Sequence, residues 1–448
     1  MRTYFIETWG CQMNRHDTER LEGQLRERGL APAVDAETAD LVLLNTCSVR
    51  EKPVQKILSR IGALAASAAP PTIGVCGCVA QQEGADLLAR SDRVAFVLGP
   101  GQIPRLNEAL RAVAQGTRPV YTGFDAEAEY NFHSIFRTSN TRGMVTVIEG
   151  CDEYCTFCIV PYTRGREVSR PLDHILDEVE QLARSGLKEV ELLGQTVNRY
   201  RDPMSGAGFA ELLDRVASVP GLHRVRFITS HPRHFGDPLI AVMARHRNVS
   251  SYLHLPVQAG SDAVLKRMNR RYTRAEYLDL VARIRRAVPH VNLSTDVIVG
   301  FPGESEADFQ ESLSLLEQVR FGQVFAFAYS PRPRTPSRRY EEQVSENVKK
   351  DRLHRLFELT DRISLELNEA LVGTTVPVLI DGDSRRDQDA WQGRAEDNRV
   401  VNFPKAGAAG IGDIVDVRID RAGPHSLVGE MVGEAARRLP VLGLAASP

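Results

Sequence analysis

The sequence predicts an α/β protein built from three successive units. Short apolar runs alternate with helical patterns in two separate blocks, and a third block is β-rich with Gly and Asp between its runs. The length agrees with this division, because 448 residues correspond to roughly three domains of ordinary size. The polar stretch 116–140 is expected to be an irregular linker. We therefore place the units at residues 1–119, 137–368 and 371–434.

The first unit is predicted to be a doubly wound parallel sheet, because each apolar run is followed by a helical pattern. The helices are expected to begin near Asp17, Glu51, Gln81 and Gln102. The predicted strands are Tyr4–Trp9, Leu41–Thr46, Thr72–Val75 and Arg93–Leu98.

The second unit repeats a strand and a helix six times, which is fewer than the eight repeats of a full β/α barrel. Its helices are expected over 172–185, 209–218, 237–246, 261–287 and 304–319, and a charged helix over 344–370 follows. The predicted strands are Met144–Ile148, Glu189–Leu193, Arg224–Ile228, Tyr252–Pro256, Val291–Val299 and Gln323–Tyr329.

The third unit is predicted to be a small antiparallel β-barrel, with strands such as Thr375–Ile380 and Asp413–Ile419. Many acidic residues balance its basic ones, so charge alone does not decide whether this unit binds nucleic acid. The basic residues are Arg385, Arg386, Arg394, Arg399 and Lys405.

The composition is that of a globular protein with a net charge of −2, which neither supports nor excludes a nucleic-acid partner. No apolar stretch is long enough to cross a bilayer, and the N-terminus lacks the apolar core of a signal peptide. We therefore expect a cytoplasmic protein without a membrane partner. In that reducing compartment, clustered thiols indicate metal binding or catalysis.

Three cysteines with the spacing C-x3-C-x2-C directly follow the first strand of the second unit. Three thiolates can hold three irons of a 4Fe–4S cluster and leave the fourth open to a small molecule, whereas electron-transfer clusters use four cysteines. A zinc site is the alternative, but zinc prefers four ligands and no second pair follows at a suitable distance. We call Cys151, Cys155 and Cys158 the barrel trio.

The first unit also carries cysteines at the carboxyl ends of its predicted strands. Such ends share one edge of a doubly wound sheet, where ligands bind, so cysteines far apart in sequence are expected to converge there. A second metal cluster is therefore predicted at this edge. Cys11 and Cys47 follow the first two strands, and spacing alone does not choose between Cys76 and Cys78 at the third.

Further candidates follow the strands of the second unit, on the face where β/α barrels place their active sites. Glycines there allow a cofactor to approach the backbone, although structural turns are an equal alternative. A structural role is also open for His231 and is favoured for His254. No catalytic side chain is assigned. The candidate cofactor-binding residues are Gly194, Gln195, Gln258, Gly300 and Gly303.

Basic residues cluster twice near the expected mouth of the barrel, and Tyr272 lies within the first cluster. Such runs are usually solvated surface, but this position suits contacts with phosphates. The clusters are Lys266, Arg267, Arg270, Arg271 and Arg274, and Arg332, Arg334, Arg338 and Arg339.

The cysteine spacing, with Phe157 before the last cysteine, resembles the radical S-adenosylmethionine (SAM) superfamily. Longer motifs over nearly the whole chain resemble its methylthiotransferases. Small departures are Trp9, where phenylalanine is common, and the additional Cys76. The motifs are Thr8–Asn14, Asn45–Lys52, Gly77–Gln81, Cys158–Glu167, Leu255–Ser261 and Tyr329–Pro333.

The resemblance implies that the second unit is a partial (β/α)6 radical SAM barrel and that the third is a TRAM-like RNA-binding barrel. It implies a first 4Fe–4S cluster on Cys11, Cys47 and Cys78, which we call the sheet trio. The barrel trio would hold a second 4Fe–4S cluster, whose open iron binds SAM so that SAM can be cleaved to a radical.

The resemblance also implies an activity. The stretch Pro161–Gly165 is similar to the branch that adds a methylthio group to C2 of N6-isopentenyladenosine, next to the anticodon of tRNA. The alternatives are another tRNA base, a ribosomal protein side chain, or an RNA-binding protein with structural metal sites. Expected partners are tRNA, an electron donor such as flavodoxin or ferredoxin, and a sulfur source. The protein is expected to be a monomer.

Overall fold

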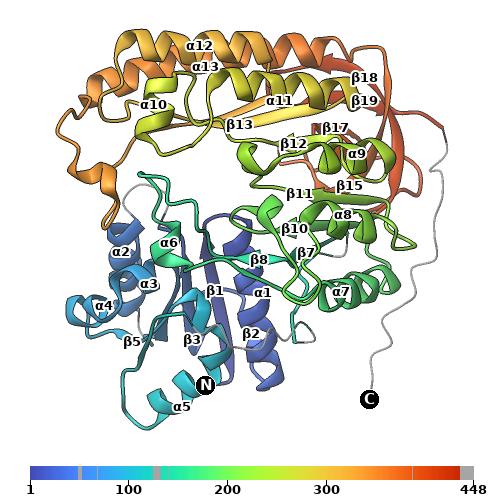
Figure 1. Ribbon diagram of the computed structural model, residues 1–448. Helices are drawn as coiled ribbons and strands as arrows, with labels where there is room; N and C mark the ends of the chain where they lie inside the picture. The colour runs from blue at the N-terminus through green and yellow to red at the C-terminus, as the bar shows by residue number, and fades with distance from the viewer. Residues whose placement is uncertain are drawn as a thin grey trace.

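The computed structural model describes residues 1–48, 53–67, 69–124, 132, 134–139, 141–385 and 387–433. The two predicted α/β units and the predicted small β-barrel follow one another along the chain, and Figure 1 shows the N-terminal sheet in blue, the β/α repeats in green to orange and the small barrel in red. Among the described helices, none is long and apolar enough to cross a membrane.

The N-terminal unit contains a six-stranded parallel sheet in the order β2-β1-β3-β4-β5-β6. All four predicted strands are confirmed, whereas the two-residue edge strands β2 and β6 give no sequence pattern. Because β6 lies within 116–140, the prediction of a wholly irregular linker was wrong there. The strands are β1 (Thr3–Trp9), β2 (Ala31–Pro32), β3 (Leu41–Thr46), β4 (Thr72–Gly77), β5 (Val94–Leu98) and β6 (Val120–Tyr121).

The first helix starts directly after Cys11, five residues before the predicted start at Asp17. Its polar first turn hid the helical pattern, because side chains such as Asn14 and His16 are buried against the rest of the protein. The start predicted near Glu51 lies outside the described residues. The helices are α1 (Gln12–Glu27), α2 (Pro53–Ala65), α3 (Cys78–Glu83), α4 (Ala85–Arg90), η1 (Pro100–Arg105) and α5 (Leu106–Ala114).

The second unit is an open barrel of six parallel strands, so all six predicted strands are confirmed. They form the sheets β7-β10-β11 and β12-β13-β14, and a bridge between Val225 and Val249 links β11 to the start of the second sheet. In the described part of the chain, no ladder joins β14 to β7, so the barrel is partial. The strands are β7 (Arg142–Thr146), β10 (Glu189–Leu193), β11 (Arg224–Phe227), β12 (Tyr252–His254), β13 (Asn292–Val299) and β14 (Gln323–Ala328).

The helices outside the barrel agree with the prediction except over 261–287, where two helices replace one. The break lies where Asn269 and Arg271 adopt left-handed backbone, with φ of 61° and 56°, and Thr273 then caps the second helix. The helices are α7 (Leu172–Arg184), α8 (Phe209–Ala217), α9 (Asp237–Arg245), α10 (Asp262–Arg267), α11 (Arg274–Ala287), α12 (Glu306–Val319) and α13 (Glu346–Glu369).

The C-terminal unit is a closed five-stranded barrel in the order β15-β16-β17-β19-β18. Its ladders are antiparallel, as predicted, except that β17 and β19 pair in parallel. Val378, Phe403 and Val417 lie in its core. The strands are β15 (Thr375–Asp383), β16 (Ala390–Ala395), β17 (Val400–Pro404), β18 (Ile414–Ala422) and β19 (Leu427–Met431).

The small barrel docks at the amino ends of the large barrel's strands. Its turn over residues 396–398 accepts hydrogen bonds from Ser250 Oγ to the Glu396 carbonyl (2.7 Å) and from Asn292 Nδ2 to the Asp397 carbonyl (2.9 Å). Arg226, within β11, bonds the side chain of Asn398. The small barrel therefore lies at the end of the large barrel opposite to the barrel trio.

Candidate metal centres and the barrel mouth

The three cysteines of the sheet trio converge at the carboxyl edge of the N-terminal sheet. Cys11 caps α1, Cys47 follows β3, and Cys78 is the first residue of α3. A hydrogen bond with Cys47 is the main cause that lowers the pKa of the Cys11 thiol to about 6; burial opposes it and the Arg164 guanidinium assists it. A thiolate is thus favoured at Cys11, beside a cation, whereas burial raises the pKa of the Cys78 thiol.

The motif residues around the sheet trio hold one another in place. Asn45 Nδ2 donates a hydrogen bond to the Asn14 carbonyl (2.8 Å), which joins β3 to the first turn of α1. Gly10 and Gly77 both have positive φ, and a Cβ atom on either would clash, at 2.5 Å, with the side-chain oxygen of Asn14 or Asn45. The two glycines are therefore needed for the strand ends to approach.

Cys76 does not belong to this edge. Its side chain lies in the hydrophobic core with Leu43, Phe96 and Leu98, and burial raises the pKa of its thiol. A strand alternates its side chains between the two faces of a sheet, which places Cys76 under the helices, whereas Cys78 lies beyond the strand end. The geometry thus separates the two cysteines that spacing left open.

The barrel trio lies in the loop after β7, between the two-residue strands β8 (Ile148–Glu149) and β9 (Val168–Ser169), with α6 (Val160–Thr163) behind it. Backbone hydrogen bonds fix this loop: Thr156 N donates to the Met268 carbonyl (3.0 Å) and Cys158 N to the Cys155 carbonyl (2.9 Å). Two side chains contact the sulfurs, since Thr196 Oγ1 lies 3.3 Å from Cys151 Sγ and Arg270 Nη1 donates to Cys155 Sγ at 3.4 Å.

The three thiols of neither trio lie close enough together to bind one metal ion as a set. Among the described residues, no group of three cysteine sulfurs lies with every pair within 4.8 Å. Thiolates around one tetrahedral zinc, with bonds of 2.3 Å, are only about 3.8 Å apart. In addition, Arg164 Nη1 is buried without a hydrogen-bond partner near Cys78 and Cys11. An anionic group held by the sheet trio would give this nitrogen an acceptor.

The two trios face each other across the junction of the first two units. Arg164, from the loop of the barrel trio, donates to Asp17 on α1 at 2.5 Å, and both side chains are buried. Helix α6 contacts α3, which begins at Cys78. Figure 1 shows α6 directly beside the end of the N-terminal sheet. The carboxyl edge of the sheet therefore meets the mouth of the barrel.

Three of the five candidate cofactor-binding residues lie against the loop of the barrel trio or line the barrel end. Gln195 accepts a hydrogen bond from Gly150 N, next to Cys151, and the Cα of Gly194 packs on Ile148. Gln258 is buried with a φ of 73° and pairs with Val297 of β13.

The other two candidates lie closer to the outer segment after β14. The space beside the Cα of Gly300 is filled by Lys349 of α13, and that beside Gly303 by Arg267. Glu304, a neighbour of Gly303, pairs with Arg352 at 2.7 Å. A cofactor would therefore contact the backbone of this loop or the opposite face of the loop. That Gly300 and Gly303 bind a cofactor stays a prediction.

Buried polar atoms without hydrogen-bond partners mark side chains that sequence reasoning did not assign. Glu153 Oε2, Ser230 Oγ and His231 Nε2 are such atoms at the barrel mouth. Ser230 and His231 follow β11, and their position at the end of a strand was the only sequence feature that marked them. No sequence feature marked Glu153. His254, by contrast, contacts Ser294 at 2.9 Å and Asp296 at 3.5 Å, which confirms its structural interpretation.

Strained backbone also marks this end of the barrel. Positive φ occurs at Tyr154 in the trio loop, at Thr229 after β11, and at Gln258, Asn269 and Arg271. Non-glycine residues adopt this conformation at an energetic cost, and such residues concentrate at functional sites.

The basic residues predicted from sequence divide into two groups. Arg267, Arg270 and Arg274 bond to Glu342, to Cys155 and to the Glu311 carbonyl, so they are not free for phosphate. Arg394 and Arg399 of the small barrel are likewise held by Asp381 and Asp397. Arg386 lies outside the described residues. Arg271 and Arg385 are exposed.

Three family models match the chain in the order of its units. They are uncharacterized protein family UPF0004 over residues 3–99, the radical SAM superfamily over 145–316 and the TRAM domain over 369–432. The fold also resembles a radical SAM methyltransferase, TsrM, from Kitasatospora setae, with a TM-score of 0.55 and 15% identity over 75% of each chain. Fold and site together define a radical SAM protein with a TRAM domain.

Curated relatives extend over the whole molecule. The tRNA-2-methylthio-N(6)-dimethylallyladenosine synthase of Bdellovibrio bacteriovorus is 44% identical over 437 residues, which are 96% of this chain and 96% of that protein. The synthase of the same name from Myxococcus xanthus is 46% identical over 96% of this chain and 94% of its own. The chain belongs to this family of radical SAM tRNA methylthiotransferases, which confirms the predicted resemblance.

Proposed function

We propose that this chain adds a methylthio group to C2 of N6-isopentenyladenosine (N6-dimethylallyladenosine) next to the anticodon of tRNA. The observation that carries the proposal is the contact between Arg164 and Asp17, because it joins the two cysteine sites in one buried junction. The relatives' name supports the substrate. A ribosomal protein side chain or a different tRNA base is therefore not favoured, and neither is a purely structural role of the metal sites.

The three units would divide the work. Residues 1–119 would hold a 4Fe–4S cluster on the sheet trio, residues 137–368 a second one on the barrel trio, and residues 371–434 would bind RNA. When bound, the barrel cluster and one SAM would supply the radical that removes the C2 hydrogen, the other cluster would supply the sulfur, and a second SAM would supply the methyl group carried by that sulfur. The proximity of Cys11 to Cys47 and Cys78, with the buried Arg164 Nη1 beside them, supports the first ligand set, and the single loop that carries the barrel trio supports the second.

The protein's own side chains would bind and orient. Ser230 Oγ and His231 Nε2 are buried without hydrogen-bond partners, although Glu153 Oε2 lies 3.9 Å from His231 Nε2, and both are available to the polar groups of SAM. Burial, followed by the charge of Arg270, lowers the pKa of His231 to about 2, so its neutral imidazole would take part in hydrogen bonds. We propose Gly194, Gln195, Gln258, Gly300 and Gly303 as further SAM contacts.

The RNA base must reach this junction from outside. A base in the single-stranded anticodon loop is extruded at lower cost than a base paired in a duplex. The carboxyl edge of the sheet would cover the base once it lies over the barrel mouth, which excludes water from the reaction. An electron donor such as flavodoxin or ferredoxin and a sulfur source complete the reaction, and we propose a cytoplasmic monomer.

The experiment is mass spectrometry of tRNA nucleosides from a strain that lacks this protein. The proposal predicts that the 2-methylthio derivative disappears while N6-isopentenyladenosine accumulates. The intact chain should restore the product, whereas a chain with Cys151→Ala should not. An unchanged nucleoside profile in the deletion strain would overturn the proposal.

A further inference from the structure

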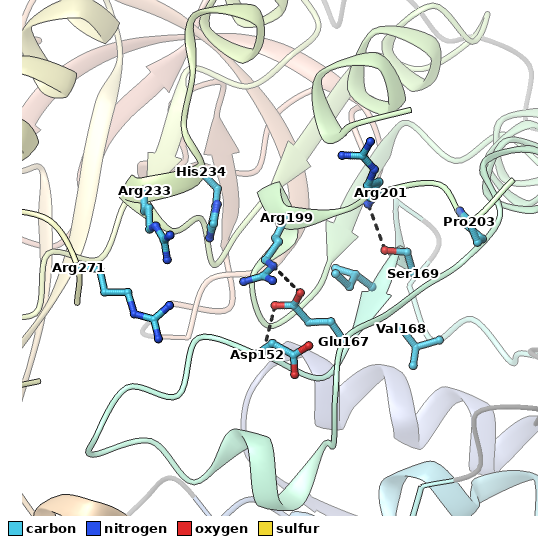
Figure 2. A pocket seen from close by; sticks show the side chains of 11 residues that line it. Asp152, Glu167, Val168, Ser169, Arg199, Arg201, Pro203, Arg233, His234 and Arg271 are labelled. Atoms are coloured by element: carbon cyan, nitrogen blue, oxygen red, sulfur yellow. Dashed lines mark hydrogen bonds and ion pairs between the residues drawn. The ribbon is translucent and has the colours of Figure 1, made fainter. Parts of the chain in front are cut away.

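A basic cavity of about 780 Å³ opens beside the barrel trio. Figure 2 shows the side chains of Arg199, Arg233 and Arg271, which follow β10, β11 and α10, on one side of the cavity, whereas the guanidinium of Arg201, also after β10, points away from them. His234 also lines it, and Asp152, next to Cys151, forms part of its wall. The cavity therefore borders the loop that carries the cysteines.

The positive charges of this cavity are only partly neutralised. Arg199 is held by Glu153 at 2.7 Å and by Glu167 at 2.6 Å. Arg233 comes no closer than 3.8 Å to Glu153 and is 42% exposed. In the described part of the chain, neither Arg201 nor Arg271 forms an ion pair with a carboxylate. Guanidinium groups in this state are available to an anion.

Two clamps tie these arginines to the cysteine loop. Asn269 Oδ1 accepts from Arg271 Nε at 3.3 Å, while its Nδ2 donates to the carbonyl of Tyr154, the residue before Cys155, at 3.0 Å. Glu153, between Cys151 and Cys155, accepts from Arg199 Nη1 at 2.7 Å and contacts His234 Nε2 at 2.6 Å. The left-handed backbone of Asn269 and Arg271 is strained, which fits a position kept for binding. An anion bound here would therefore lie at a fixed position relative to the barrel trio.

We infer that this cavity binds the phosphate backbone of the RNA beside the extruded base. The inference rests on the proposed function, because it takes tRNA as the substrate. A phosphodiester chain presents several anions in a row, which matches arginines spread over a cavity of this size. The SAM carboxylate, a single anion, would need only one of them.

The test uses the full-length holoprotein with the two charges of Arg233 and Arg271 removed (Arg233→Gln with Arg271→Gln). A matched control removes two exposed arginines from outer helices, Arg215 of α8 and Arg286 of α11 (Arg215→Gln with Arg286→Gln). The probe is an anticodon stem-loop RNA that carries the isopentenyl group, and its Kd is measured by fluorescence anisotropy at several KCl concentrations.

We expect the cavity variant to bind this RNA about tenfold more weakly than the parent protein. The slope of log Kd against log salt should fall by about one to two, because one or two phosphate contacts are lost. The control should match the parent protein. Equal affinity and slope in the two variants would overturn the inference, and so would a loss of SAM binding with RNA affinity intact. The binding measurement does not require turnover. Failure of the methylthiolation reaction would therefore refute the proposed function, whereas the measured RNA affinities would still test this inference.

Discussion

Arg164 donates a hydrogen bond to Asp17 across the junction of the first two units, at 2.5 Å, and both side chains are buried. Arg164 lies six residues after Cys158, and Asp17 lies six residues after Cys11. One buried ion pair therefore connects the loop of the barrel trio to the helix that begins at the sheet trio. A reaction that uses both sites needs this fixed relation.

The first prediction concerns the stability of that junction. Arg164→Gln removes the close partner of the buried Asp17 carboxylate and leaves only Arg20, whose Nη1 lies 3.8 Å away, so the free energy of unfolding should fall by about 3 kcal/mol. The double variant Arg164→Leu with Asp17→Leu should recover much of this loss, because neither charge is left alone. Chemical denaturation measures both values.

A surface ion pair provides the control for this experiment. Arg362 and Glu317, 3.3 Å apart, are more than half exposed, so Arg362→Gln should change the free energy of unfolding by less than about 1 kcal/mol. If the double leucine variant is as unstable as Arg164→Gln, the unpaired charge is not the cause of the loss.

The second prediction concerns iron content. Anaerobically reconstituted protein should contain about eight irons per chain, in two clusters. Alanines in place of the barrel trio should leave about four irons and abolish SAM cleavage. Alanines in place of the sheet trio should also leave about four, with SAM cleavage retained. Iron analysis and detection of 5′-deoxyadenosine measure the two outcomes.

Cys76→Ala is the matched control, because Cys76 lies in the core rather than at the sheet edge. This variant should keep both clusters. Loss of the N-terminal cluster from Cys76→Ala would show that the choice of Cys78 was wrong. Tightly bound zinc in place of iron would contradict the assignment of both trios.

The third prediction concerns the reduction potential of the barrel cluster. Arg270 is buried and donates to Cys155 Sγ at 3.4 Å, and hydrogen bonds and positive charge next to a cluster favour its reduced form. Arg270→Gln should therefore make the potential more negative by tens of millivolts, on the order of 1 kcal/mol. Redox titration followed by electron paramagnetic resonance measures this shift. A potential equal to that of the parent protein would exclude a role of this arginine in tuning.

Most strands of the two large units could be predicted from sequence because they are buried and rich in apolar residues. Leu41–Thr46, which begins with four apolar residues, was placed at its observed bounds, and so was Glu189–Leu193, although Glu189 and Glu191 interrupt its apolar residues. The start of α1 was missed, because Asn14, His16 and Asp17 are polar yet buried at a junction that sequence patterns do not reveal.

The cysteine sites could be located from strand ends, but the basic cavity could not. Arg199, Arg233 and Arg271 are far apart in sequence and lack a common spacing, so only the closure of three loops brings them together. The run around Arg271 was noticed, yet most of its basic residues make internal contacts. A charged run does not show which of its members face solvent.

The fourth prediction concerns the small C-terminal barrel. Removing this barrel would expose Arg226 and Asn292, which it now contacts. A truncated protein could therefore lose RNA affinity through lower stability as well as through lost RNA contacts. Replacement of exposed arginines, Arg385→Gln with Arg421→Gln, should instead weaken tRNA affinity and flatten its salt dependence without loss of stability. Filter binding at several salt concentrations measures this effect. Unchanged affinity would indicate that these arginines do not contact RNA.

The central claim is that the chain methylthiolates an adenosine that already carries an isopentenyl group. Burying about four carbons of that group, at about 0.8 kcal/mol each, could favour modified over unmodified tRNA by more than about 100-fold. The measurement is mass spectrometry of nucleosides after an anaerobic reaction with SAM, a reductant and a sulfide source, on tRNA with and without the isopentenyl group. The account predicts the 2-methylthio product on the isopentenylated tRNA and about 100-fold less on the other. Equal turnover of both tRNAs, or a methylthiolated ribosomal protein with tRNA untouched, would contradict it.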